Sequence, residues 1–180
     1  METLQELYQE SIKDVYSAEK QFLKAMPKLA KKAQSAALKE ALHTHLEQSQ
    51  THVEKLEKIG ELGGFKLRGV VCKAAHGLVE EAQEHLEEGK PGPVLDAAIV
   101  ACAQKNEHYE IGTYGTILAW ATELGEKEHV ALLKEILAEE EQTDKLLSGV
   151  ATNEVNKAAH NAVEIEEKPA PKTKAKAAAK

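Results

Sequence analysis

Apolar residues recur at intervals of three and four over most of the chain, which is the spacing of one face of an α-helix. This spacing predicts a helix over about residues 3–33, a second over 35–60, a shorter one over 71–88 and a further long helix over 127–147. The segment 94–124 is apolar nearly all round, which indicates a helix buried on most of its sides. No segment alternates between apolar and polar residues with a period of two over a useful length, so the sequence predicts an all-α fold.

Glycine and proline mark where the predicted helices end. Gly63 follows the second helix, Gly89–Pro93 separates the third from the fourth, and Gly125 ends the fourth. Thr3 is a candidate N-cap of the first helix. Pro27 lies inside the first helix and is expected to kink or divide it.

Four long helices, with a short extra helix on the connection between the second and the fourth, predict a four-helix bundle with a crossover connection. We expect this helical domain to span residues 1–160. The segment 161–180 is rich in Lys, Ala and Pro towards its end, and such a composition predicts a disordered tail.

The charge of the chain distinguishes its body from its tail. The formal net charge is −7, but Lys168–Lys180 holds five lysines and no acid, so the rest of the chain carries −12. An acidic body with one arginine, Arg68, and seven aromatic residues argues against a surface that recognises phosphates or stacks bases. Contact with nucleic acid is therefore expected only from the tail, as a weak and salt-sensitive interaction.

Three features lead us to expect a cytoplasmic protein without a membrane span. The longest apolar run, Ala97–Ala103, has seven residues, whereas a membrane-spanning helix needs about 20. The acidic N-terminus has no apolar signal core. Cys72 and Cys102 lack close spacing, and we expect two buried free thiols, as in a reducing compartment.

Acidic residues occupy faces that should be apolar. Glu19 lies in the middle of the apolar face of the first predicted helix, and Glu107 and Glu110 are three apart on the most apolar helix. Glu140 and Asp144 are four apart on the apolar face of the last long helix. An ionised carboxylate in a dry core costs several kcal/mol unless it is paired or bound to a cation. We therefore expect these three helices to meet around one or two metal ions.

The second helix is expected to complete this site with His45 and His52, which lie beside its apolar face. That predicted face runs through Leu38, Leu42, Leu46, Ser49, Val53 and Leu56. Ferritin-like di-iron carboxylate bundles use a Glu from each of two helices and a Glu-x-x-His motif from each of the other two. The match is imperfect, because the second helix has no inward Glu-x-x-His and Asp144 stands where a His is expected. The ligand types suit two ions of Fe or Mn.

A metal-free polar core is the alternative interpretation. The same acids could pair with His45, His52, His108 or Lys105, or accept hydrogen bonds from tyrosines. The protein would then be a dimeric structural or interaction protein whose basic tail makes weak contacts with DNA or another polyanion.

Several segments resemble the YciF/YciE-type ferritin-like stress proteins of bacteria. The resemblance spans about Leu4–Ala159 and rests on Asp14–Gln21, His45–Gln48, Cys72–Ala74, Asp96–Ala98, Gln104–Ile111, Tyr114–Thr116 and Glu139–Asp144. Its most specific motifs are the Glu-His-Tyr-Glu-Ile block that begins at Glu107 and the acidic cluster that ends at Asp144. Family members often have Glu where this chain has Gln48 and His76.

The resemblance implies a rubrerythrin-like bundle, a homodimer, expression under stress and a link to metal. Combined with the acids on apolar faces, it leads us to expect a ferritin-like stress-response protein with a di-iron or di-manganese carboxylate site. The expected chemistry is ferrous oxidation or the reduction of peroxide. The candidate ligands are Glu19, His45, His52, Glu107, Glu110, Glu140 and Asp144.

Overall fold

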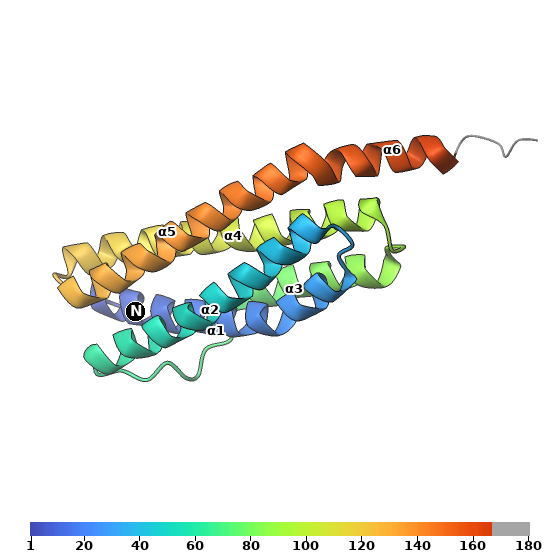
Figure 1. The fold of residues 1–180 in the computed structure, drawn as a ribbon. Helices are drawn as coiled ribbons and strands as arrows, with labels where there is room; N and C mark the ends of the chain where they lie inside the picture. Colours follow the sequence, from blue (N-terminus) through green and yellow to red (C-terminus); the bar gives the residue numbers. More distant parts are fainter. Residues whose placement is uncertain (167–180) are drawn as a thin grey trace, which may run out of the picture.

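Four long helices form the body of the protein, and a computed structural model describes residues 1–166 of the chain. The long helices are α1 (Leu4–Lys32), α2 (Ala36–Leu62), α4 (Pro93–Glu123) and α5 (Lys127–Val150). A shorter helix, α3 (Lys73–Glu88), lies on the connection between α2 and α4. A π-helical turn, η1 (Ala151–Val155), joins α5 to α6 (Asn156–Glu166). Within the described residues, the predicted all-α bundle with a helix on its crossover is confirmed (Figure 1).

The long helices pack in the cyclic order α1, α2, α5, α4. Helix α1 contacts α2 and α4, and α5 contacts the same two helices from the other side. The connection through α3 returns the chain along the bundle, and α3 packs against α1 and α4 as it does so (Figure 1). Every long helix therefore runs antiparallel to its two neighbours, and all four project side chains into the middle of one core.

The first helix begins where the sequence predicts. The hydroxyl of Thr3 accepts the backbone N–H of Glu6 at 3.1 Å, and the Glu6 carboxylate accepts the backbone N–H of Thr3 in return. Pro27, by contrast, does not divide the helix, because α1 continues through it to Lys32. Its ring is exposed, so the backbone hydrogen bond that proline removes is lost on the side where water can replace it.

Two apolar clusters occupy the two ends of the bundle core. One includes Met26, Leu42, Ile99 and Leu147, and the other includes Tyr8, Ile12, Leu56, Ile117 and Ile136. On each long helix the residues between these two sets carry the acids and histidines that are described below. The core is therefore apolar at both ends and polar in its middle layer.

The buried face of α2 differs from the predicted one. His45 and His52 are buried, whereas Leu46 and Val53, which were expected to face the core, are only half-buried. The helix is turned because its two imidazoles find carboxylate partners inside the bundle, so hydrophobicity alone misplaces the face. Cys72 and Cys102 are both buried and free, as expected.

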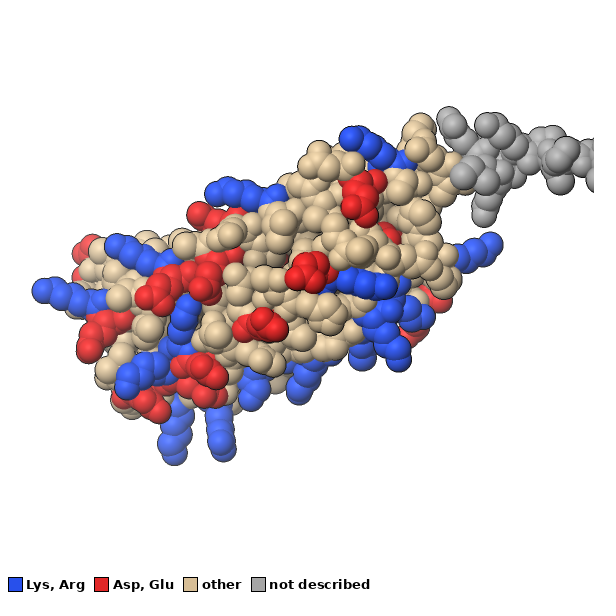
Figure 2. Space-filling view, in the orientation of Figure 1, with Lys and Arg blue, Asp and Glu red and all other residues tan. Residues whose placement is uncertain are grey.

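The helical structure extends past the domain boundary that was predicted at residue 160, because α6 continues to Glu166. Most of the predicted tail, residues 167–180, lies outside the described residues. None of the helices within residues 1–166 has the long uncharged apolar stretch that crossing a bilayer requires. Figure 2 shows acidic and basic side chains interspersed on the face over α2 and α5, so this face carries no field of a single sign.

Asp96 connects the first turn of α4 to the short link between α1 and α2. One carboxylate oxygen accepts the backbone N–H of Gln34 at 2.7 Å, and the other accepts that of Ser35 at 2.8 Å. The Asp96 side chain is 4% exposed, whereas Gln34 is exposed and Ser35 is half-buried, so the carboxylate itself is shielded from water. The hydroxyl of Ser35 in turn caps α2 by accepting the backbone N–H of Leu38.

We expect Asp96→Ala to lower the free energy of unfolding by about 3 kcal/mol, because it removes two hydrogen bonds between a charged acceptor and the backbone. Asp96→Asn keeps one acceptor and should lose roughly half as much. Urea unfolding followed by circular dichroism measures both values. An alanine variant as stable as the parent protein would contradict this role.

Candidate metal centre

Six acidic and imidazole side chains from four helices meet in the middle layer of the bundle. They are Glu19 from α1, His45 and His52 from α2, Glu107 and Glu110 from α4, and Glu140 from α5. None is more than 4% exposed. Residues three or seven apart on a helix share a face, which is why α2 and α4 can each direct two of these side chains inward. The structure thus brings together six of the seven residues that the sequence singled out.

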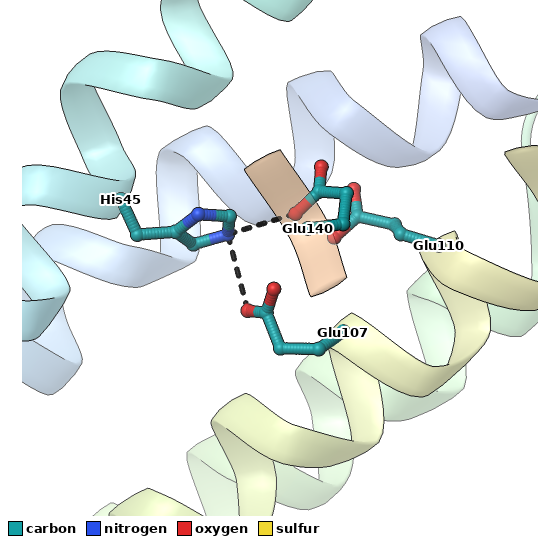
Figure 3. A group of neighbouring side chains, drawn as sticks. All are labelled: His45, Glu107, Glu110 and Glu140. Atoms are coloured by element: carbon teal, nitrogen blue, oxygen red, sulfur yellow. Dashed lines mark ion pairs between the residues drawn. The ribbon is translucent and has the colours of Figure 1, made fainter. Parts of the chain in front are cut away.

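The first group of ligand atoms consists of His45, Glu107, Glu110 and Glu140 (Figure 3). One ligand atom from each lies within 4.8 Å of all the others. The Nε2 atom of His45 is 3.1 Å from a carboxylate oxygen of Glu107 and 3.8 Å from one of Glu140. A separation of this size suits a set of ligands around one cation.

The second group consists of Glu19, His52 and Glu140, and it meets the same 4.8 Å condition. The Nδ1 atom of His52 is 2.9 Å from Glu140 and 3.4 Å from Glu19. Tyr114, also buried, donates its hydroxyl to Glu19 at 2.6 Å. Glu140 belongs to both groups, and its two oxygens contact different histidines. A carboxylate with this placement can contact two cations at once.

Glu139 holds the outer nitrogen of His52, and the sequence analysis did not identify it as part of the site. Its carboxylate lies 2.6 Å from Nε2 of His52 and 3.3 Å from the ammonium group of Lys55. The two successive acids of α5, Glu139 and Glu140, therefore contact the two nitrogens of one imidazole. This fixes the ring with Nδ1 directed into the centre. No periodicity signals this role, because Glu139 is adjacent to a buried residue and is itself one-third exposed.

Burial and mutual repulsion raise the pKa of three of the four carboxyl groups. The pKa of Glu110 lies well above its ordinary value because of burial and the charges of Glu140, Glu19 and Glu107. Burial raises the pKa of Glu107 to about 7 despite its contact with His45, and it raises that of Glu19 as well. Without a cation, these acids therefore retain protons at pH values where exposed carboxyl groups are ionised.

Glu140 is the exception, because it is the acid that both histidines contact. Burial opposes its ionisation, but the 2.9 Å contact with His52 and the charges of His45 and His52 lower the pKa of Glu140. In the same way, contact with Glu140 and Glu19 outweighs burial and raises the pKa of His52 to about 10. The hydrogen bond and charge of Glu107 likewise raise the pKa of His45 against the effect of burial. In the metal-free centre these contacts thus favour the charged form of both imidazoles, which offsets part of the negative charge of the carboxylates.

Several buried polar atoms in this layer still lack a hydrogen-bond partner within the described chain. They include one carboxylate oxygen each of Glu19, Glu107 and Glu110, and the hydroxyl of Ser49. An unpartnered buried polar atom is uncommon and costs about 1–3 kcal/mol. A cation bound between the carboxylates would provide these oxygens with a partner, so the donor set fits a metal ion.

The donors match the di-iron template in number but not in position. The template has four glutamates and two histidines, counted over four helices, and the same six side chains meet here. Ser49 and Thr143, however, occupy the template's Glu position on α2 and its His position on α5. Glu110 supplies the fourth carboxylate from α4. His45 supplies the second imidazole from α2, with its Nδ1 atom 3.4 Å from the hydroxyl of Thr143.

Asp144 does not join either group. Its carboxylate lies 3.3 Å from Nε2 of His108 and accepts a hydrogen bond from Gln104, and its side chain is 23% exposed. The buried line of α5 runs through Ile136, Glu140, Thr143 and Leu147. Asp144, four residues after Glu140, lies to one side of this line and nearer the surface. The sequence pattern did not distinguish Asp144 from Thr143 as the residue that faces the core.

Comparisons with known proteins agree with the fold. Residues 3–160 match a family described as "Domain of unknown function (DUF892)". The chain is 41% identical to the protein YciF of Escherichia coli over 162 residues, which is 89% of this chain and 98% of that protein. It also matches the crystal structure of the E. coli stress protein YciF with a TM-score of 0.83, covering 87% of this chain and 99% of that one.

Two further solved structures are similar. The chain is 42% identical to YcfI, named "a putative structural protein", from Rhodopseudomonas palustris, with a TM-score of 0.80 over 84% of this chain and 96% of that one. A protein from Xanthomonas campestris has a TM-score of 0.70 over 92% of this chain and 100% of that one, but at 18% identity it shows the fold alone.

We expect Glu110→Gln to raise the melting temperature of the metal-free protein at pH 8 by about 3 °C, or about 1 kcal/mol for a domain of this size. Because the native pKa of Glu110 is raised, the native state keeps a proton that the unfolded state releases above a pH of about 4.5. The native protein therefore loses stability as pH rises, and glutamine removes this loss.

The difference between variant and parent should accordingly vanish below about pH 4 and grow towards pH 8, which a series of melting curves in the presence of a chelator would measure. Glu141→Gln, which changes an exposed acid on α5, is the matched control and should leave the curves unchanged. A constant difference at every pH would show that Glu110 is not the titrating group.

Proposed function

Since the chain belongs to the DUF892 family together with the E. coli stress protein YciF, we propose that it is a ferritin-like protein whose central layer binds two ions of iron or manganese. The observation that carries the proposal is the convergence of four glutamates and two histidines, nearly all fully buried, with unpartnered carboxylate oxygens among them. A stable protein keeps such a layer at a cost in stability, and a cation offsets that cost.

The composition of the layer favours Fe or Mn. Carboxylates suit Mn and Mg, and imidazoles suit Fe and other transition metals, so a mixed set favours Fe and Mn. Four ionised glutamates and two neutral histidines carry a formal charge of −4, which two divalent ions neutralise. One ion would be held by His45, Glu107, Glu110 and Glu140. The other would be held by Glu19, His52 and Glu140.

Bound in this layer, Fe or Mn would supply one-electron redox chemistry towards dioxygen or peroxide, for ferrous oxidation or the reduction of peroxide. The residues of the chain have separable roles in such chemistry. Glu140 links the two ion positions, and Glu139 orients His52. Tyr114 orients Glu19 through the 2.6 Å hydrogen bond of its hydroxyl. The apolar clusters on either side exclude water from the layer.

A metal-free structural protein is the second candidate, and the description of YcfI as a structural protein favours it. In that case the two imidazoles, together with protons retained on the buried carboxyl groups, would compensate the charge of the layer.

Metal binding separates these two functions. We expect the purified chain to bind two Mn²⁺ or Fe²⁺ ions, and metal at about 100 times Kd to stabilise it by about 2.7 kcal/mol, which is roughly 5–10 °C in melting temperature. Glu140→Ala should abolish binding of both ions, because this residue serves both groups. Glu141→Ala is the matched control on the same helix. Calorimetry and elemental analysis measure the stoichiometry, and a melting temperature unchanged by chelation would favour the structural protein.

We also propose that the chain forms a homodimer through the outward face of α4. In the second half of this face the exposed residues are Gly112, Thr116 and Ala119, which are small and uncharged, whereas Lys105 and His108 are exposed nearer its start. A shallow groove beside them, between α1 and α4, is lined by Ser11 and Trp120 among others. Small side chains permit close approach of a second helix, which supports this face as the contact between subunits.

Gly112→Arg should convert the dimer to a monomer in analytical ultracentrifugation. A Cβ atom added at Gly112 meets nothing within 4 Å in the single chain and the position is exposed, so the variant should fold normally. Gly77 on α3 has the same free space, and Gly77→Arg is the control that should stay dimeric. A parent chain that sediments as a monomer would overturn the proposal.

A further inference from the structure

Ser49 is the buried polar residue of the central layer that has no assigned role so far. It lies on α2 one turn from His45 and one turn from His52, on the same face as both, and it is 1% exposed. Its hydroxyl has no hydrogen-bond partner among the described residues. Both neighbouring histidines contact Glu140, so the hydroxyl of Ser49 lies on the side of α2 that faces the centre.

The absence of a partner is unusual for a hydroxyl inside a helix, because it normally bonds to the backbone carbonyl four residues earlier. Threonines elsewhere in this protein do so, at distances between 2.7 and 3.1 Å: Thr113, Thr116, Thr122, Thr143 and Thr152. Ser49 has the same option through the carbonyl of His45 but does not use it. Its hydroxyl is therefore available to donate to a group that is not part of the chain.

The position of Ser49 is also where a ligand is missing. In the di-iron template this position, three residues before the histidine, holds a glutamate. Here Glu110 restores the number of carboxylates, but it joins the group of His45. The group of Glu19, His52 and Glu140 therefore has three donor residues against four in the other. Iron and manganese accept further ligands from solution at positions that a protein leaves open.

We propose that Ser49 marks a binding position for a small ligand from solution, which completes the group of Glu19, His52 and Glu140 and accepts a hydrogen bond from the hydroxyl of Ser49. This inference rests on the proposed function, because the ligand binds only when the ions are present. The ligand is compact, because it must fit between side chains of a layer in which Ser49 and all the donors are buried. It is neutral or singly charged, because the carboxylates already balance two divalent ions. Water, hydroxide and peroxide belong to this class, and azide is a stable probe for it.

The test uses the full chain loaded with two equivalents of Mn²⁺ and titrated with azide, followed by electron paramagnetic resonance and calorimetry. We expect the parent protein to bind one azide per centre. Ser49→Ala should keep both ions but bind azide about fivefold to tenfold more weakly, which corresponds to the loss of one hydrogen bond. Ser49→Glu should keep both ions and bind no azide, since its carboxylate occupies the position. Thr51→Ala removes an exposed hydroxyl from the same helix and should behave like the parent protein.

A second measurement excludes a merely structural role. In the metal-free protein, Ser49→Ala removes an unsatisfied buried hydroxyl, so its melting temperature should equal or exceed that of the parent. A lower melting temperature would show that the hydroxyl stabilises the fold and would overturn the inference.

The remaining outcomes separate this inference from the proposed function. Two bound ions with no azide binding, or with equal azide affinity in the parent and Ser49→Ala, would overturn the role of Ser49 and leave the metal centre standing. Failure of the parent chain to bind Mn²⁺ or Fe²⁺ would overturn the proposed function, and this inference with it.

Discussion

Four carboxyl groups lie in one layer of a dry helical core, and the free energy that their ionisation costs there determines which groups must surround them. Each ionised group loses its hydration on burial and is repelled by the other three. The chain compensates part of this charge with two imidazoles, both of which contact Glu140, and another part by leaving protons on acids such as Glu110. Such compensation requires all four long helices to present their polar residues at one level.

The two apolar clusters keep the layer at that level. They fill the bundle on both sides of the acids with large buried side chains, including Leu38, Leu56 and Ile117. Interiors packed in this way resist displacement, because any shift opens a cavity. The polar groups are thus fixed near one another even when their mutual repulsion opposes it. Asp96 and the capped helix ends hold the connections from which the long helices start.

The numbers of carboxylates and imidazoles agree with the di-iron template, whereas their distribution among the helices does not. One carboxylate that the template has on α2 is found here on α4, and one imidazole that it has on α5 is found here on α2. The total number of each kind of ligand is the same. A side chain can serve from either of two helices that border the layer if it reaches the same point with the same charge. This distribution places Ser49 and Thr143 at positions where the template has ligands. It also gives one group four donor residues and the other group three.

The helices, the all-α class and most of the candidate donors can be predicted from the amino-acid sequence. Periodic apolar residues place the helices to within a few residues, and acids such as Glu19, Glu107 and Glu140 stand out because they interrupt apolar faces. Three features are visible only in the folded bundle. They are the buried face of α2, the position of Asp144 outside the centre while Glu139 contacts His52, and the lack of a partner for Ser49 among the described residues. The reason is physical. Periodicity records which residues avoid water on one helix, whereas the pairing of polar groups depends on the rotation and height of four helices relative to one another.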